Sequence, residues 1–552
     1  MDYSLIANSG IQLLSKRIDI NLNEGFKCRF AESFDDERFQ WRLEFAYTLS
    51  NQIVVLTSQL REKGYLDNDN KLTTSEAVIL ANPEVKQFNI ADNEEDSLGI
   101  FFSKLAANNK FLSHYFNVWL PMPYIEKDDT GDYKKGPYNW CKFMIVPRET
   151  NAGILTADVV LAFDTQTRYN TLDTYKEYPV FLSDGETEKI FGLCGNERQL
   201  IDYCTWNKNW VRDYLMEIAY PDAKNFDVLE LKDGRHKYEF LATYLMLIKY
   251  LSSLDDFFPT VKLMRDRDVN IVNVEMIIDI GNSRTSALLF ENNKFTQDFT
   301  KVDPLRLQNF THVILPNGDL NRVEETFDMR LAFRKVTIGK NIAGSNQFVW
   351  PSIIRLGREA NYLNHEATAL NLGLETLSTN SSPKRYLWDN KRTENEWRFI
   401  NIGDENNSLP PIIEGLTSFI NDDGTYNAEG YGIGAHYSRR SLMTLAFIEI
   451  IEQAITQINS FQSRERHDLR NTPRRLERVI ITCPFTCTGC ILCTGRGEKD
   501  VNGQVEEGKL HKFSTAVYEQ FRRPGCVAED GGIRYRNSEG IYPPFGYGIA
   551  KA

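Results

Sequence analysis

The spacing of apolar positions divides the first half of the chain into predicted helices and strands. Helical spacing runs from Asp35 to Glu62, and a second helix is expected from Leu98 to Tyr115. From Asn117 to Val180, short apolar runs separated by Gly, Pro and Asp predict strands. Two longer helices are then expected, over Glu197 to Ile218 and over Lys237 to Leu254. This mixture of periods predicts an α+β region at the N-terminus.

A charged segment from Met264 to Asn270 marks the predicted end of this first region, which we assign to residues 1–265. An α/β domain is expected over residues 271–484, where apolar strands precede and follow a long amphipathic helix. Its parts are expected in this order: a hairpin over 276–300, an inserted subdomain over about 301–435, and a helix and a strand over 442–484.

The predicted hairpin consists of an apolar strand, a small polar turn and a second apolar strand. The first strand ends at Asp279, whose carboxylate is suited to hydrated Mg²⁺. A glycine in the turn lets the backbone approach a ligand closely, and exposed N–H groups and hydroxyls donate to phosphate oxygens. The alternative is an ordinary hairpin with the usual turn residues. The turn residues are Gly281, Asn282, Ser283, Arg284 and Thr285.

Composition narrows the classes of function. The chain has 552 residues, of which 42% are hydrophobic and 25% charged, as in globular proteins. Its net charge of −12 argues against a protein that coats nucleic acid. Neither a signal peptide nor a membrane span is evident, and an odd number of mostly isolated cysteines indicates a reducing compartment. We therefore expect a cytoplasmic protein with no nucleic-acid partner.

The turn motif Asp-x-Gly-x-Ser-x-Thr resembles the first phosphate motif of the actin, sugar-kinase and heat-shock-chaperone ATPase superfamily. In the chaperones a Pro-Ser strand and then a lysine element follow the hairpin, and similar segments occur here at Pro351 and Lys384. The apolar strand from Arg478 to Pro484 matches a later strand of the same superfamily. The resemblance implies half of an actin-like domain with a ribonuclease-H-like fold.

Two families resemble the chain more closely. The hairpin from Asp279 is similar to the opening of type III pantothenate kinases, which begin with this motif, whereas here a long region precedes it. Most of the chain is more similar to the SrfB virulence factor family. The segments that carry this resemblance are ANSGIQ from Ala7, DIGNSRT from Asp279, FVWPSIIRLGREA from Phe348 and SSPKRYLWD from Ser381.

The superfamily resemblance implies roles for the hairpin residues. Asp279 would position Mg²⁺ and its water, and the turn from Gly281 to Thr285 would hold the β- and γ-phosphates of ATP. Lys384 would stabilise charge on the transferred phosphoryl group, although a plain surface position is the alternative for this lysine. Arg284 could contact phosphate or fill the site with its own charge. The implied activity is at most that of an ATPase, used as a conformational switch that acts on a protein partner.

The pattern changes after Pro484. The second phosphate motif of the superfamily has no clear counterpart, and the late candidate at Asp530 follows no apolar strand. We therefore expect residues 485–552 to be irregular, as in a C-terminally truncated or frame-shifted protein. Four closely spaced thiols could instead bind zinc or an iron–sulfur cluster, a reading that we rank below the ATP site. These thiols are Cys483, Cys487, Cys490 and Cys493.

Three functions follow from these observations. The preferred one is an ATP-binding switch coupled to a partner protein. The second is an interaction or scaffold protein that keeps the fold without turnover, and the third is a metal-cluster protein. Binding of ATP with Mg²⁺ separates the first from the other two.

Overall fold

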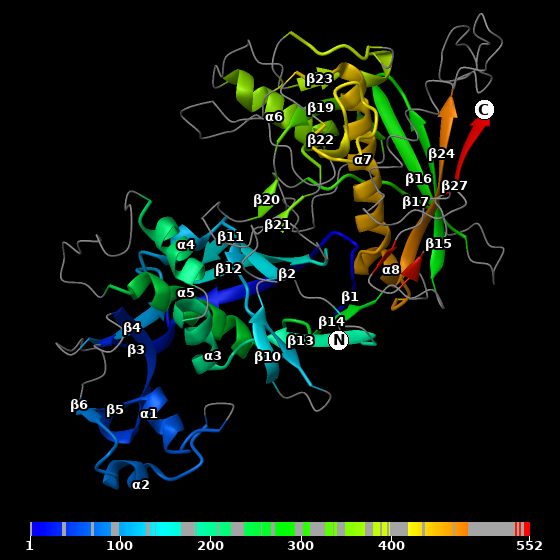
Figure 1. Ribbon diagram of the computed structural model, residues 1–552. Coiled ribbons are helices and arrows are strands. Elements are labelled where there is room, and N and C mark those ends of the chain that lie inside the picture. The colour runs from blue at the N-terminus through cyan, green and yellow to red at the C-terminus, as the bar shows by residue number, and fades with distance from the viewer. Residues whose placement is uncertain are drawn as a thin grey trace, which may run out of the picture.

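The computed structural model contains two regions, one above the other in Figure 1, where the first region runs from blue to green and the second from green to red. The residues described are 3–35, 40–67, 71–89, 99–128, 133–138, 140–166, 182, 185–206, 209–221, 237–254, 257–265, 271–292, 302–309, 326–334, 336–338, 348–350, 352–369, 379–386, 389–394, 397, 418–432, 436–466, 470–483, 536–537, 540–541 and 546–551.

Three sheets form the first region, and the strands expected after Asn117 are confirmed. The first and last strands of this region pair in parallel, so the N-terminal end of the region is fixed to its C-terminal end. In pairing order the strands are β1 (Tyr3–Ile6), β14 (Val261–Met264), β13 (Glu188–Leu193), β9 (Tyr124–Lys127) and β10 (Tyr133–Tyr138); β2 (Ile11–Asn21), β12 (Ile154–Asp164), β11 (Cys141–Asn151) and β8 (Leu120–Pro121); and β6 (Gln87–Asn89), β5 (Ile53–Leu56), β4 (Gln40–Thr48), β3 (Phe26–Asp35) and β7 (Ile100–Leu105).

Strand β12 is buried on both faces, because successive side chains of a strand point to opposite sides of the sheet. Leu155, Val159 and Phe163 belong to the large core of the first region. Val160 and Ala162 face a second, smaller core. The almost continuous apolar run of this strand therefore serves two cores.

Helix α5 (Glu239–Ser253) lies at the centre of the first region and is buried along most of its length. The buried carboxylate of Glu32 accepts backbone N–H groups of Lys237 and Tyr238 beside its first turn, where a negative charge is favourable. The helix expected over Lys237 to Leu254 is thus confirmed. The other helices of this region are α1 (Thr57–Glu62), α2 (Glu76–Ala81), α3 (Glu197–Ile201), a π-helical turn (Asp202–Trp206) and α4 (Asn209–Ala219).

Two predicted helices are wrong. In the described part of the range from Asp35 to Glu62, strands β4 and β5 replace the expected helix, with a short 3₁₀ helix (Ser50–Gln52) between them and helix α1 at the end. The buried residues Leu43 and Phe45 alternate with more exposed neighbours, which is the period of a strand. The range from Leu98 to Tyr115 holds β7 and a short 3₁₀ helix. In both ranges β-branched and aromatic residues favoured strands over the helical spacing.

One mixed sheet forms the core of the second region. Strand β15 (Val272–Ile280) pairs in parallel with β24 (Arg474–Cys483), and β24 with β27 (Gly546–Lys551), whereas β16 (Arg284–Asn292) runs antiparallel to its neighbours. In pairing order the strands are β17 (Val302–Pro304), β16 (Arg284–Asn292), β15 (Val272–Ile280), β24 (Arg474–Cys483) and β27 (Gly546–Lys551), and β18 (Thr326–Asp328) also pairs with β16.

Helix α7 (Arg439–Ile458) packs along one face of this sheet (Figure 1). Val274, Met276 and Ile278 on β15 share one apolar core with the helix, which confirms the helix expected over Leu442 to Ile458. Among the described helices α7 is the one long and apolar enough to cross a membrane, and 89% of its apolar window is buried inside the protein. A core helix of this kind meets the same criteria.

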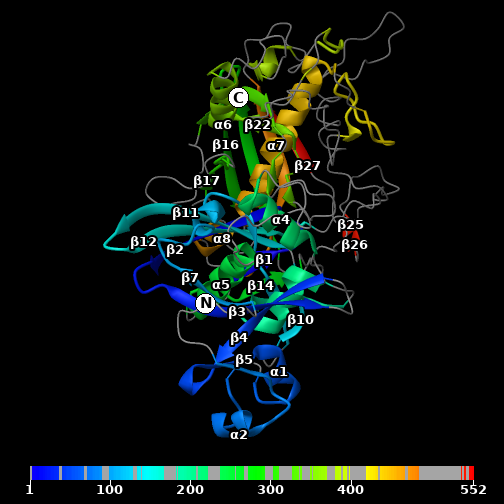
Figure 2. The same cartoon turned by 90° about the vertical axis from the view of Figure 1, so that its left-hand side faces the viewer.

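Smaller elements surround the sheet. In Figure 1 and Figure 2 helix α6 lies in the upper part of the molecule, and α1 and α2 lie at the opposite end. The range 485–552 was expected to be irregular, but it contains strand β27 and two other short strands. Most of that range lies outside the described residues. The smaller elements are β19 (Arg330–Phe333), β20 (Thr337–Ile338), β21 (Phe348–Val349), β22 (Ile354–Leu356), α6 (Gly357–Ala369), β23 (Thr379–Ser381), a 3₁₀ helix (Pro383–Tyr386), α8 (Phe461–Arg466), β25 (Arg536–Asn537) and β26 (Gly540–Ile541).

An apolar cluster joins the two regions. The β20–β21 hairpin of the second region covers the outer face of β2 and β12 in the first. Because side chains from both regions fill this cluster, neither region encloses its apolar surface alone. The buried members are Ile11, Leu13, Val160, Ala162, Val336, Ile338, Phe348 and Trp350.

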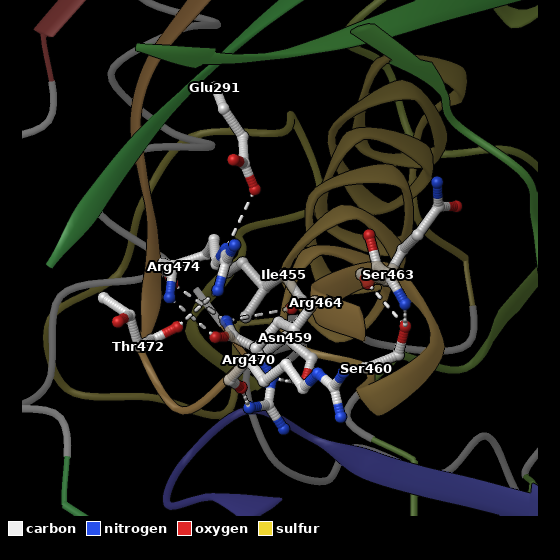
Figure 3. A network of polar contacts seen from close by, with 10 residues as sticks. Glu291, Ile455, Asn459, Ser460, Ser463, Arg464, Arg470, Thr472 and Arg474 are labelled. Carbon is white, nitrogen blue, oxygen red and sulfur yellow. Dashed lines mark hydrogen bonds and ion pairs between the residues drawn. The ribbon is translucent and has the colours of Figure 1, made fainter. Parts of the chain in front are cut away.

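A polar network lies at the turn from α7 through α8 to β24 (Figure 3). The Asn459 side chain exchanges two hydrogen bonds of 2.9 Å with the backbone of Arg474, whose Nε donates to Glu291 at 2.8 Å. The fully buried Arg464 donates to the carbonyl oxygens of Asn459 and of Ser4 on β1. Its burial lowers the pKa of Arg464 to about 10. The network thus fixes the end of α7 to the first strand of the chain.

The segment ANSGIQ belongs to the same joint. Gln12 donates through Nε2 to the carbonyl oxygen of Thr456 at 3.3 Å. Gly10 has a φ of +88°, and a Cβ on this residue would lie 2.5 Å from Oγ1 of Thr456. Only glycine therefore lets the two regions approach so closely at this point.

Candidate functional site

The candidate site lies at the carboxyl end of β15. The parallel strands β15, β24 and β27 all end at this edge, with Asp279 in register with Thr482 and Thr482 with Ala550. Asp279 is exposed between the buried residues Ile278 and Ile280, so its side chain points away from the core shared with α7. Ligands of open α/β sheets bind at such an edge, at the point where the strand order reverses.

The turn after β15 is closed by a tight backbone contact. A Cβ on Gly281 would lie 2.2 Å from the carbonyl oxygen of Arg284, so no other residue fits without opening the turn. Asn282 and Ser283 are exposed. Thr285 points the other way: it is 1% exposed, and its hydroxyl has no hydrogen-bond partner in the part of the chain that the structure describes. The turn therefore presents polar groups on both sides of the sheet edge.

Lys384 reaches the same strand end from a distant part of the chain. It lies in the 3₁₀ helix Pro383–Tyr386, and its Nζ donates to the carbonyl oxygen of Ile280 at 2.5 Å. The two residues are 104 positions apart in sequence. An ammonium carries three N–H donors, so this contact leaves capacity for an anion at the same place.

Backbone hydrogen bonds connect the lysine segment with the turn through Met329. The Met329 amide donates to the carbonyl oxygen of Ser283 at 2.8 Å, and the Ser382 amide donates to the Met329 carbonyl oxygen at 2.9 Å. Ser382 adopts a φ of +56°, which is uncommon for a residue other than glycine. The three segments thus form one connected unit around the end of β15.

Arg284 lies beside an acidic residue of the neighbouring strand. Its side chain is 73% exposed, and Nε lies 3.5 Å from Oδ1 of Asp328, its cross-strand neighbour on β18. The other carboxylate oxygen of Asp328 accepts a 2.9 Å hydrogen bond from Asn361 on α6. Sequence reasoning missed Asp328, because nothing in the local pattern relates it to the turn.

Sequence reasoning also missed a buried ionic cluster between α7 and β22. Glu449 of α7 accepts hydrogen bonds from Trp350 at 2.6 Å and from Arg355 at 2.8 Å, and all three side chains are buried. Arg355 also lies 3.8 Å from Glu359. An acidic residue within the apolar run of α7 was the available signal, since a buried carboxylate requires a partner.

The cysteine hypothesis is only partly within the described structure. Cys483 is the last residue of β24, at the same edge as Asp279. Cys487, Cys490 and Cys493 lie outside the described residues. In the described part of the chain no group of three or more His, Cys, Asp or Glu side chains is placed to hold a metal ion.

Comparison with known proteins gives one family. The profile of the family described as virulence factor SrfB matches residues 2–489. No curated protein and no solved structure is significantly similar to the chain. The match includes the hairpin, the lysine segment and the joint between the two regions, and it covers most of the chain. The chain therefore belongs to the SrfB virulence factor family.

Proposed function

We propose that the edge at the end of β15 binds the phosphates of ATP together with Mg²⁺. In this proposal the Asp279 carboxylate holds the hydrated metal ion, and the N–H groups and hydroxyls of the turn from Gly281 to Thr285 donate to phosphate oxygens. Lys384 and Arg284 supply positive charge on the outer phosphates. The cycle of binding and release acts as a conformational switch on a protein partner.

The observation that carries the proposal is the contact between Lys384 and Ile280. The superfamily resemblance implied that a lysine far along the chain serves the phosphate hairpin, and its ammonium lies 2.5 Å from the last residue of the hairpin's first strand. A lysine on an arbitrary surface would have no reason to meet this strand end.

Two further observations support the proposal. The strand order β17-β16-β15-β24-β27, with β16 antiparallel to the others, is the order of a ribonuclease-H-like sheet, the fold that the resemblance implied. In addition, backbone hydrogen bonds through Met329 connect the turn to the lysine segment, so that both surround the same strand end.

Helix α7 offers a route from the nucleotide to the first region. Its N-terminal end lies near the lysine segment, since the Arg440 amide donates to the Asp389 carbonyl oxygen at 3.1 Å. Its C-terminal end belongs to the joint with Ser4 and Gln12. A shift of the lysine segment on phosphate binding would therefore move a helix that is fixed to the first region.

Calorimetry with ATP and Mg²⁺ tests the proposal on the intact chain and on Asp279→Ala. Glu275→Ala is the matched control, because Glu275 is a carboxylate on the same face of β15, paired with Arg478 at 3.4 Å away from the strand end. We expect binding by the unchanged protein and by the control, and a loss of about tenfold or more in Asp279→Ala. Equal affinity in all three proteins would remove Asp279 from the site.

Absence of binding in all three would favour the second candidate, an interaction protein without nucleotide. Turnover is measured separately as phosphate release. Binding without release would identify a switch driven by occupancy alone.

A further inference from the structure

We infer that Asp328 lowers the affinity of the site by competing with phosphate for the Arg284 guanidinium. The inference rests on the proposed function, since it concerns the affinity of the same site for a polyphosphate. It adds a residue that no sequence motif indicated.

Register fixes Asp328 opposite Arg284. Arg284 on β16 is the cross-strand partner of Asp328 on β18, and the neighbouring backbone hydrogen bond from Met329 to Ser283 holds the two segments together. Directly opposed side chains of an antiparallel pair interact, so the arginine cannot leave the reach of the carboxylate without rotating its side chain. Phosphate at the turn would be within reach of the same guanidinium.

The two contacts of Asp328 differ in quality. Asn361 donates to Oδ2 at 2.9 Å, within the normal range of hydrogen bonds, whereas Arg284 Nε lies 3.5 Å from Oδ1. The arginine and aspartate side chains are 73% and 49% exposed. Exposed ion pairs of this kind contribute little. Helix α6 therefore anchors the carboxylate, and the guanidinium remains easily exchanged.

A phosphate offers the guanidinium a better partner. Its oxygens match the planar fork of arginine with two parallel hydrogen bonds. Arg284 would then turn from Asp328 to the ligand. Because the ion pair with Asp328 is lost in this step, Asp328 would lower the affinity for phosphate. The ligand class is a polyphosphate, as its Mg²⁺ complex.

A double-mutant cycle tests the competition, with the affinity for ATP and Mg²⁺ measured by calorimetry at low salt. Asp328→Asn removes the competing charge and keeps the size of the side chain. We expect binding to tighten about two- to fivefold, a gain that disappears in the Arg284→Gln background and shrinks at high salt. Asn361→Ala should weaken binding, because the carboxylate is then free to pair fully with Arg284.

The outcomes separate this inference from the proposed function. Two results would refute competition for the arginine and leave the site itself intact. In the first, the unchanged protein and Asp328→Asn bind ATP with the same affinity. In the second, Asp328→Asn increases the affinity by the same factor whether Arg284 or Gln stands at position 284. If neither the unchanged protein nor any variant binds, both proposals fail. Glu275→Gln, which loosens the partly exposed Arg478–Glu275 pair of the same sheet, should leave the affinity unchanged, and thermal unfolding of each variant verifies its fold.

Discussion

The ammonium of Lys384 lies 2.5 Å from the carbonyl oxygen of Ile280 and so closes the carboxyl end of β15. This single contact joins a 3₁₀ helix to a strand that the chain forms 104 residues earlier. A neutral backbone carbonyl group holds the lysine in place, so this contact leaves the positive charge of the ammonium without a counter-charge from the carbonyl.

Lys384→Met should weaken the binding of ATP with Mg²⁺ by about tenfold, because a charge-assisted hydrogen bond to phosphate is lost. Arg385→Met is the matched control, since Arg385 is the exposed neighbour in the same 3₁₀ helix. Both variants should unfold within about 1 kcal/mol of the unchanged protein, because a single partly exposed hydrogen bond is removed. Equal affinities in the two variants would contradict a phosphate role for Lys384.

Gly10→Ala should loosen the joint between the two regions. Its Cβ would lie 2.5 Å from Oγ1 of Thr456, and the positive φ adds strain. Gly64→Ala is the control, because Gly64 has a φ of +69° but no atom within 4 Å of its Cβ position. Because Gly64→Ala carries the strain of the positive φ without the clash, we expect faster proteolysis and a clearly larger fall in melting temperature for Gly10→Ala than for Gly64→Ala. Thr456→Ala should restore part of the loss, and an additive double variant would show that the contact is unimportant.

Glu449→Ala should be strongly destabilising, by about 3–5 kcal/mol, because Arg355 would lose its closest buried counter-charge. Urea unfolding followed by tryptophan fluorescence measures this change, and Trp350 itself reports on the site. Glu465→Ala, on the exposed surface of α8, should change the free energy of unfolding by less than about 0.5 kcal/mol. A loss below 1 kcal/mol for Glu449→Ala would mean that Glu359 is a sufficient partner for the arginine.

Stability should fall in alkaline solution because of buried thiols. Desolvation raises the pKa of Cys28 and of Cys194 from 9.0 to about 12, and that of Cys141 and Cys204 well above 9.0. The unfolded chain releases these protons at lower pH than the folded chain does. The contribution of the thiols is therefore complete below pH 9 and is lost as the pH rises toward 12.

Burial makes three of these thiols unreactive in the native protein. Peptide mapping after alkylation at pH 8 should find Cys141, Cys194 and Cys204 unlabelled in the native protein, and fully labelled after denaturation. Rapid labelling of Cys141 in the native state would contradict its position in the core.

The sequence was sufficient where a local pattern determined the structure. The apolar stripe of α7 and the alternation around Asp279 needed no distant partner to be recognised. The order of motifs along the chain also indicated that Lys384 serves the hairpin, and the structure brings the two segments together. Whether they hold a nucleotide stays a prediction.

Sequence patterns predicted the wrong element where a helical and a strand period fitted the same residues. They also missed residues whose roles depend on contacts with distant parts of the chain. Around Leu43 the apolar residues satisfy both helical and strand spacing, and pairing with β3 selects the strand. Asp328 and Glu449 gain their roles only through partners on other elements. Gly10 resembles any turn glycine until the fold places it against Thr456.

The shared apolar cluster has a consequence for synthesis on the ribosome. The face of β2 and β12 that carries Ile11 and Ala162 is complete early, yet its cover includes Trp350, which emerges much later. At about 5–20 residues per second this face waits on the order of ten seconds or more for its cover. The nascent chain therefore displays an uncovered apolar surface until the segment that carries Trp350 has been made.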